Sequence, residues 1–196
     1  MDNDRLSALR HSLAHLLAAA VMELYPDAKR TIGPAIDNGF YFDFEFPTEK
    51  PGENDLPALE KKMREILPTW SEFKRSELTA EEAKAQYPEN PYKHELIEEF
   101  TKEGQKVSFY ASGPTYTDLC RGGHVENPAK EIAPDSFKLD RIAGAYWRGD
   151  EKNTMLTRIY GLAFESKEKL GAYLYQREEA KARDHRKVGK EQGLFI

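Results

Sequence analysis

The sequence predicts an α+β fold: an antiparallel sheet packed with helices, plus a C-terminal linker helix. Three observations predict this class. Residues 5–24 carry leucines at helical spacing, residues 40–46 alternate as a half-buried strand does, and residues 166–190 form a long charged stretch of helical character. Helices and short strands mixed along one chain are typical of helices packed on an antiparallel sheet.

The first predicted helix covers residues 5–24 and ends before Pro26. Its apolar face consists of Leu6, Leu9, Leu13, Leu16, Leu17, Ala20 and Leu24. The opposite face carries His11, His15, Ala18 and Met22, and no charged residue occurs between His11 and Met22. Because a surface helix would place charges there, we expect this helix to be covered on both sides, with its histidines facing a cleft.

The remaining elements follow from local signals. A turn at 37–39 precedes the strand at 40–46, and helices are predicted at 56–67 and 92–100. Thr79 and Glu82 have the spacing of a capping box, which starts another helix. Strands are predicted at 107–111 and 115–120, whereas residues 138–160 show a mixed pattern with several glycines.

Length and composition place limits on function. The 196 residues suit one domain, or one domain with a helical extension, and no apolar run is long enough to cross a bilayer. The N-terminus lacks the features of a signal peptide, so we expect a cytoplasmic protein without membrane partners. The single cysteine, Cys120, excludes an internal disulfide and could be a buried hydrophobe, a metal ligand or a reactive thiol.

Charge is unevenly distributed along the chain. The formal net charge is −5, yet residues 138–190 hold 13 Lys or Arg against 8 Asp or Glu. Such a basic region can contact nucleic-acid phosphates, although solvated helix faces would give the same composition.

Four side chains form a candidate chemical site. His11 and His15 are four residues apart on one helix face, and Cys120 and His124 are four apart near a glycine turn. Three imidazoles and one thiol could bind zinc in a tetrahedral site. Two chemistries fit them: metal-activated water, or metal-free hydrolysis with a histidine base and a lysine or backbone amides stabilising the oxyanion. Asp118 points to the same side of its strand as Cys120 and could bind an ammonium group.

The chain resembles the editing domain of threonyl-tRNA synthetases of the bacterial type, and more distantly the alanyl-tRNA editing proteins. The resemblance rests on motifs that run in family order along almost the whole chain: Arg10-His11-Ser12-Leu13-Ala14-His15-Leu16, Ile32-Gly33-Pro34, Asp37-Asn38-Gly39-Phe40-Tyr41, Asp118-Leu119-Cys120-Arg121-Gly122-Gly123-His124, Ala145-Tyr146-Trp147-Arg148-Gly149-Asp150 and Met155-Leu156-Thr157-Arg158-Ile159-Tyr160-Gly161. It implies an editing domain at residues 1–162 and a linker helix at 163–196 that leads to an aminoacylation domain.

The resemblance also assigns site residues. It implies that the four His and Cys side chains face the pocket, that Asp118 contacts the substrate's amino group, and that Lys93 is the catalytic lysine. It places Gly33, Tyr41 and Phe42 in the substrate pocket. Relatives often have tyrosine where this chain has Phe42, which has no hydroxyl to form a hydrogen bond.

The implied reaction is hydrolysis of the ester of seryl-tRNA(Thr). One methyl group separates serine from threonine and gives only roughly 10–200-fold discrimination, so a second, hydrolytic site is needed. We expect metal-free catalysis with His11 as the base and no required cofactor, with zinc as the alternative; in that case its ligands would be His11, His15, Cys120 and His124. The alternatives for the protein are a free-standing deacylase working in trans and a zinc-stabilised tRNA-docking module without catalysis.

The C-terminal region adds further expectations. Three basic residues, called here the C-terminal basic set, are expected to bind tRNA: Arg183, Arg186 and Lys187. The apolar ending at 193–196 suggests that another domain would follow. Chemistry with ATP, and formation of a homodimer, would belong to that domain.

Overall fold

The computed structural model describes residues 3–102 and 104–191, and the side chains of the last helix as far as Arg183. Its helices are α1 (Asn3–Leu24), α2 (Leu56–Ile66), α3 (Ala80–Ala85), α4 (Pro91–Phe100), α5 (Pro128–Glu131) and α6 (Lys167–Glu191), with short 3₁₀ turns η1 (Glu53–Asp55), η2 (Leu67–Thr69) and η3 (Trp147–Gly149). Its strands are β1 (Lys29–Arg30), β2 (Ala35–Ile36), β3 (Gly39–Glu45), β4 (Lys74–Leu78), β5 (Val107–Ser112), β6 (Tyr116–Leu119), β7 (Phe137–Tyr146) and β8 (Met155–Ala163).

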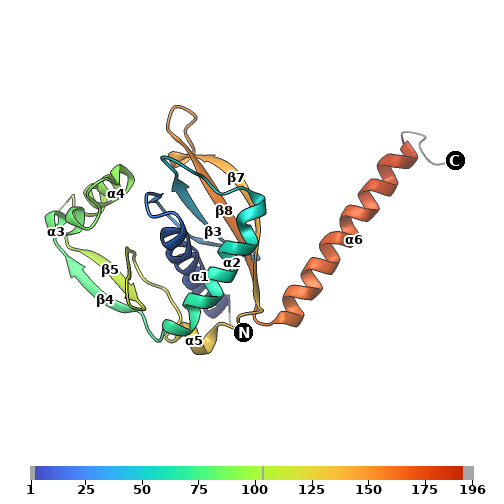
Figure 1. Ribbon diagram of the computed structural model, residues 1–196, viewed down its shortest axis with the longest axis horizontal. Helices are drawn as coiled ribbons and strands as arrows, with labels where there is room; N and C mark the ends of the chain where they lie inside the picture. The colour runs from blue at the N-terminus through green and yellow to red at the C-terminus, as the bar shows by residue number, and fades with distance from the viewer. Residues whose placement is uncertain (1–2, 103, 192–196) are drawn as a thin grey trace.

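The strands form two antiparallel sheets, which we call sheet A and sheet B. Sheet A has the order β1-β3-β8-β7, with β2 paired to β3, and sheet B has the order β4-β5-β6. Helix α1 lies between them, and α2 packs beside it (Figure 1). The predicted α+β class is confirmed, but the strands are divided between two sheets where the sequence indicated one.

Helix α1 is buried on both sides, as its uncharged second face predicts. Leu9, Leu13, Leu16 and Leu17 are at most 2% exposed and belong to the main core together with the phenylalanines of β3. His15 on the opposite face is 3% exposed. Burying each large apolar side chain contributes roughly 1.5–3 kcal/mol, so this double-sided packing fixes the helix that carries the two histidines.

The long hairpin of β7 and β8 was not evident from the sequence. The register between these strands shifts at Leu139 and Arg141, and this irregularity breaks the alternation that would identify β7. Strand β4 was also missed because four of its five residues are exposed. In the centre of sheet A, a Cβ on Gly161 would lie 2.3 Å from Cζ of Phe40, so only glycine lets this ring pack against β8.

Helix α6 projects away from the rest of the molecule (Figure 1). Its first part is held by an ion pair of 2.6 Å between Arg177 and Asp140 of β7, and by Tyr173 against Phe164. Strand β8 ends at Ala163 and α6 begins at Lys167, so the proposed division after residue 162 falls between these two elements; the division itself stays a prediction. Within the described residues, no helix combines the length and apolar character required to cross a membrane.

Candidate functional site

A cavity of about 300 Å³ lies where α1, α4 and the two sheets meet. It is lined by His11 and His15 of α1, Lys93, Leu96 and Phe100 of α4, Thr31, Ile32, Gly33, Pro34 and Phe42 of sheet A and its approach, and Asp118, Leu119, Cys120 and Arg121 at the end of β6. The structure therefore brings together residues that are more than 100 positions apart in the sequence, including most of the predicted site.

The His and Cys side chains form one cluster. Their nearest ligand atoms all lie within 4.8 Å of one another. The Cys120 Sγ is 3.3 Å from Nε2 of His124 and 3.6 Å from Nε2 of His11. The ring of His124 is stacked between His11, at 4.4 Å between centroids, and Phe73, at 3.9 Å. His124 does not itself line the cavity but contacts the three cluster side chains that do, His11, His15 and Cys120.

Burial keeps the cluster uncharged. Desolvation lowers the pKa of His11, lowers that of His15 well below its ordinary value, and lowers the pKa of His124 to about 3. Burial also raises the pKa of Cys120 to about 11. At neutral pH the three imidazoles are therefore free bases and the cysteine is a thiol, which suits proton acceptance by a histidine.

Asp118 is the hub of a buried charge network. Its Oδ1 lies 2.8 Å from Nζ of Lys93 and 3.3 Å from Nε of Arg30, and it accepts a hydrogen bond of 2.6 Å from the Tyr87 hydroxyl. The carboxylate is 1% exposed and Lys93 is 2% exposed. Burial alone would raise the pKa of Asp118, but the Lys93 and Arg30 charges outweigh it and hold that pKa well below its usual range.

Lys93 keeps its place through the start of α4. Asn90 caps this helix by accepting a hydrogen bond from the Lys93 backbone N–H at 3.1 Å, and its amide donates to the Arg30 carbonyl at 2.8 Å. Desolvation lowers the pKa of Lys93, while Asp118 opposes that shift. A buried ammonium with one fixed partner is a preorganised positive charge at the pocket wall.

Tyr116 connects Asp118 to His15. The Tyr116 hydroxyl donates to Oδ2 of Asp118 at 3.4 Å and lies 2.8 Å from Nδ1 of His15. In the tautomer that carries its proton on Nδ1, His15 donates to the tyrosine oxygen while the Tyr116 hydroxyl donates to the carboxylate. The Nε2 of His15 is then an acceptor, as a base or a metal ligand requires.

This network changes the interpretation of Asp118. Besides Lys93, Arg30 and Tyr87, its Oδ1 accepts from the Leu119 backbone N–H at 3.0 Å. A carboxylate with these partners is engaged in holding the pocket together, so the geometry favours a positioning role. Its predicted contact with a substrate amino group stays a prediction.

Three further predicted residues separate into two groups. Gly33 and Phe42 line the cavity and touch each other: a Cβ on Gly33 would lie 2.1 Å from Cδ2 of Phe42. Tyr41 does not line it, so the structure does not place it with the other two, and its role in the substrate pocket stays a prediction. Successive strand residues point to opposite faces, and Tyr41 packs on the far side of β3 against Tyr160 and under the Arg158 guanidinium, 3.8 Å from its ring centroid.

The cluster has the donors for a zinc ion. Zinc bonds of about 2.0–2.3 Å in a tetrahedron place ligand atoms roughly 3.3–3.8 Å apart, and the two Cys120 distances fall in this range. One feature does not fit. The buried Nδ1 of His124 has no hydrogen-bond partner among the described residues, whereas the second nitrogen of a metal-bound histidine ordinarily donates to one.

Sequence reasoning missed Arg30, Tyr87 and Tyr116. Tyr116 precedes Asp118 by two residues in β6 and so shares its face, a signal that could have identified it. Within the C-terminal basic set, Arg183 is exposed on α6 and its Nε donates to the Glu179 carbonyl at 3.4 Å. The side chains of Arg186 and Lys187 lie outside the described residues.

Comparisons with known proteins identify sequences that this chain resembles. Residues 107–160, which contain β5, β6 and the β7–β8 hairpin tip, match the family described as the threonyl and alanyl tRNA synthetase second additional domain. The chain is 52% identical over 190 residues to a threonine–tRNA ligase of Rubrobacter xylanophilus, covering 97% of this chain and 29% of the relative. It is 51% identical over 192 residues to the ligase of Borrelia turicatae, covering 98% and 32%.

The chain thus spans about a third of the length of these relatives. The matches extend over nearly all of it, through both sheets, the pocket and α6. The chain therefore belongs to the threonyl-tRNA synthetase family, as the part of those longer proteins that contains the second additional domain.

Proposed function

We propose that this pocket edits tRNA by hydrolysing the ester of seryl-tRNA(Thr), within an enzyme that joins threonine to tRNA(Thr) using ATP. The single observation that carries the proposal is the juxtaposition of neutral histidines with a buried Lys93–Asp118 pair in one small cavity. Proton-accepting groups and a fixed positive charge are what ester hydrolysis needs.

The proposed reaction uses the chain's own side chains. His11, the more accessible of the two α1 histidines, takes a proton from a water molecule as its oxygen attacks the ester carbonyl carbon. The Lys93 ammonium stabilises the negative oxygen that forms, and His15 orients the water through its free Nε2. The tetrahedral intermediate then expels the ribose oxygen, which takes the proton back from His11, giving serine and free tRNA.

We propose that catalysis requires no metal. Four protein ligands would leave a zinc ion without an open position for water, which a catalytic zinc site keeps. Among the residues that the structure describes, none offers the Nδ1 of His124 the hydrogen bond that supports zinc-bound histidines. If zinc were bound, His11, His15, Cys120 and His124 would hold it, and it would supply Lewis acidity.

Selection of serine over threonine follows from the pocket wall. Gly33 and Phe42 are in contact, so this wall cannot retreat to admit an extra methyl group without moving the phenyl ring. The tRNA would bind partly along α6, where the C-terminal basic set lies. In the cytoplasm, the full-length enzyme would work as a homodimer formed through its aminoacylation domain.

The test is deacylation of seryl-tRNA(Thr) and threonyl-tRNA(Thr) by the purified chain. We expect rapid loss of serine and at least about 10-fold slower loss of threonine. A matched control is Lys84→Ala, a half-buried lysine outside the cavity, beside Lys93→Ala within it. Equal rates on both esters would refute serine selection. Stoichiometric zinc without turnover would favour the docking module, and turnover by the separate chain as fast as that of the whole ligase would favour the free-standing deacylase.

A further inference from the structure

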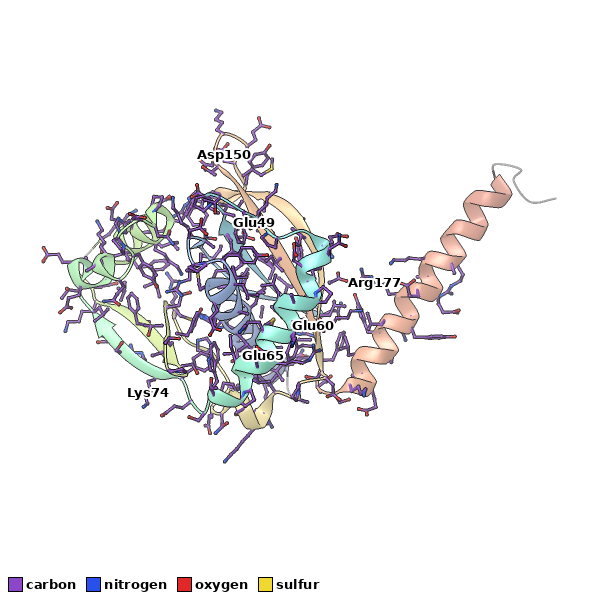
Figure 2. All side chains as sticks on the ribbon, viewed as in Figure 1. Glu49, Glu60, Glu65, Lys74, Asp150 and Arg177 are labelled. Carbon is purple, nitrogen blue, oxygen red and sulfur yellow. The ribbon has the colours of Figure 1, made fainter. Side chains whose placement is uncertain are left out.

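The motif at 145–150 lies outside the cavity, yet it contacts the helix that carries Lys93. It forms the tip of the β7–β8 hairpin, which belongs to sheet A, and this tip lies on the same side of the molecule as α4 (Figures 1 and 2, where Asp150 is labelled). Trp147 Nε1 donates to Oε2 of Glu95 at 2.8 Å. Arg148 donates to Oε1 of Glu95 at 2.5 Å and to Oε2 of Glu99 at 2.6 Å.

The same contacts complete the core under α4. A second hydrophobic cluster consists of residues from α3, α4, β5, β6 and the turn before α4, plus Trp147 and Leu156 from the hairpin. Trp147 is 6% exposed and meets Tyr92 at 5.2 Å between ring centroids. The hairpin of one sheet therefore inserts an anchor into the core of the other.

Arg148 adopts a conformation that needs an explanation. Its φ is 55°, in the left-handed region, and Gly149 follows with φ of 71°. Non-glycine residues seldom occupy this region. Here it aims one guanidinium at two carboxylates one turn apart on α4, Glu95 and Glu99.

Helix α4 presents a different face to the pocket. Lys93, Leu96 and Phe100 line the cavity, while Glu95 and Glu99 face the hairpin. A small movement of α4 would shift the Lys93 ammonium relative to Asp118. Misplacement of a reacting group by about 1 Å can reduce a rate by 10²-fold, so the position of this helix matters for the pocket.

We propose that Trp147 and Arg148, at the tip of the sheet A hairpin, form a clamp on α4. They are positioning residues that hold α4, and with it Lys93, against the pocket. The ion pairs are exposed, and such pairs contribute little to global stability. Loss of the clamp should therefore loosen α4 locally and leave the rest of the fold intact. The effect on catalysis rests on the proposed function; the effect on Lys93 itself does not.

The experiment uses Arg148→Gly and Trp147→Phe in the full chain. Arg148→Gly removes both ion pairs and suits the left-handed backbone, so it should not impair folding. Trp147→Phe keeps an aromatic anchor but removes the donor to Glu95. The control is Lys84→Ala, which deletes an ion pair of 2.6 Å between Lys84 of α3 and Glu98 of α4.

The readout is acylation of Lys93 by an amine-reactive reagent, measured by peptide mass spectrometry, beside amide hydrogen exchange in α1. In Arg148→Gly we expect labelling to rise about 10-fold, deacylation kcat to fall about 10-fold, and α1 exchange to stay unchanged. Trp147→Phe should show a smaller change in the same direction, and Lys84→Ala none.

Labelling of Lys93 at the parent rate in both variants would overturn the clamp, whatever happens to deacylation. An increase in α1 amide exchange as large as the increase in Lys93 labelling would also overturn the clamp. The hairpin tip would then stabilise the whole fold and not α4 alone. Faster labelling in a protein whose parent form does not deacylate would support the clamp and refute the proposed function, so the two failures are distinguishable.

Discussion

Replacing Asp118 by asparagine removes the hub of the buried network while keeping its size. Lys93 is 2% exposed and would lose its partner at 2.8 Å, and Arg30 would lose one at 3.3 Å. Removing one partner of a buried ion pair costs about 3–5 kcal/mol. Domain stabilities are about 5–15 kcal/mol, so this single change should remove a large share.

The part of the loss that comes from Lys93 has an upper bound. Its ammonium, with an ordinary pKa of 10.5, can deprotonate instead of staying charged without a partner. Doing so at pH 7 costs about 1.4 kcal/mol for each of about 3.5 pH units, or roughly 5 kcal/mol. We therefore expect Asp118→Asn to lower the free energy of unfolding by about 3–5 kcal/mol.

The assay is urea unfolding at pH 7 with linear extrapolation. The control is Asp135→Asn, whose carboxylate is 57% exposed and 3.7 Å from Lys167; it should cost less than about 1 kcal/mol. We also expect coupling in a double-mutant cycle with Lys93→Met. The sum of the stability losses in the two single variants should exceed the loss in the double variant by about 1–3 kcal/mol. A loss below about 1 kcal/mol for Asp118→Asn would refute the network.

The same variant has a distinct acid response. Because the pKa of Asp118 is lowered in the folded state, its stabilising contribution is complete above the unfolded pKa, near 4, and is lost as pH falls below it. Unfolding free energy in the parent should therefore fall more steeply below about pH 4 than in Asp118→Asn. Parallel slopes would contradict the lowered pKa.

Four other outcomes follow from the geometry. Cys120, whose pKa burial raises to about 11, should react with iodoacetamide at pH 8 far more slowly than free cysteine, and Cys120→Ser should keep partial deacylase activity. Gly33→Ala should displace the Phe42 ring and reduce deacylation at least about 10-fold without unfolding the protein; an unchanged rate would remove this wall from the site. Replacing the C-terminal basic set by alanine should weaken tRNA binding and reduce the slope of log affinity against log salt by about 2–3, if each residue meets one phosphate. Elemental analysis should find no stoichiometric zinc, and chelation should leave deacylation intact; activity lost on chelation and restored by zinc would overturn the metal-free mechanism.

Local patterns explain what the sequence could predict. The leucine spacing of α1, the alternation of β3 and the capping box at Thr79 each operate within a few residues, and the structure contains all three. The β7–β8 hairpin escaped prediction because its register shift interrupts the alternation and its outer face carries polar and aromatic residues in place of a clean pattern.

The site also contains some residues that local patterns predict and others that they do not. His11 with His15, and Cys120 with His124, are visible as pairs because each pair spans four residues, and the structure brings both pairs into one cluster. Arg30 has its role only through Asp118, which lies 88 residues away in the sequence, and no local pattern records that contact. Electrostatic partners that lie far apart in the sequence can be identified only once the fold is known.

The charge of the buried network bears on what the pocket can stabilise. Asp118 contributes one negative charge, Lys93 and Arg30 contribute two positive charges, and the three histidines are neutral because burial lowers their pKa values. The network therefore carries a net charge of +1. A unit charge at about 4 Å attracts an opposite charge by about 4 kcal/mol at an effective dielectric constant of 20. In the proposed ester hydrolysis this interaction would grow as negative charge develops on the ester oxygen. The same excess would oppose an ammonium group in the pocket, so the geometry favours a role for Asp118 in fixing Lys93; its predicted contact with a substrate amino group stays a prediction.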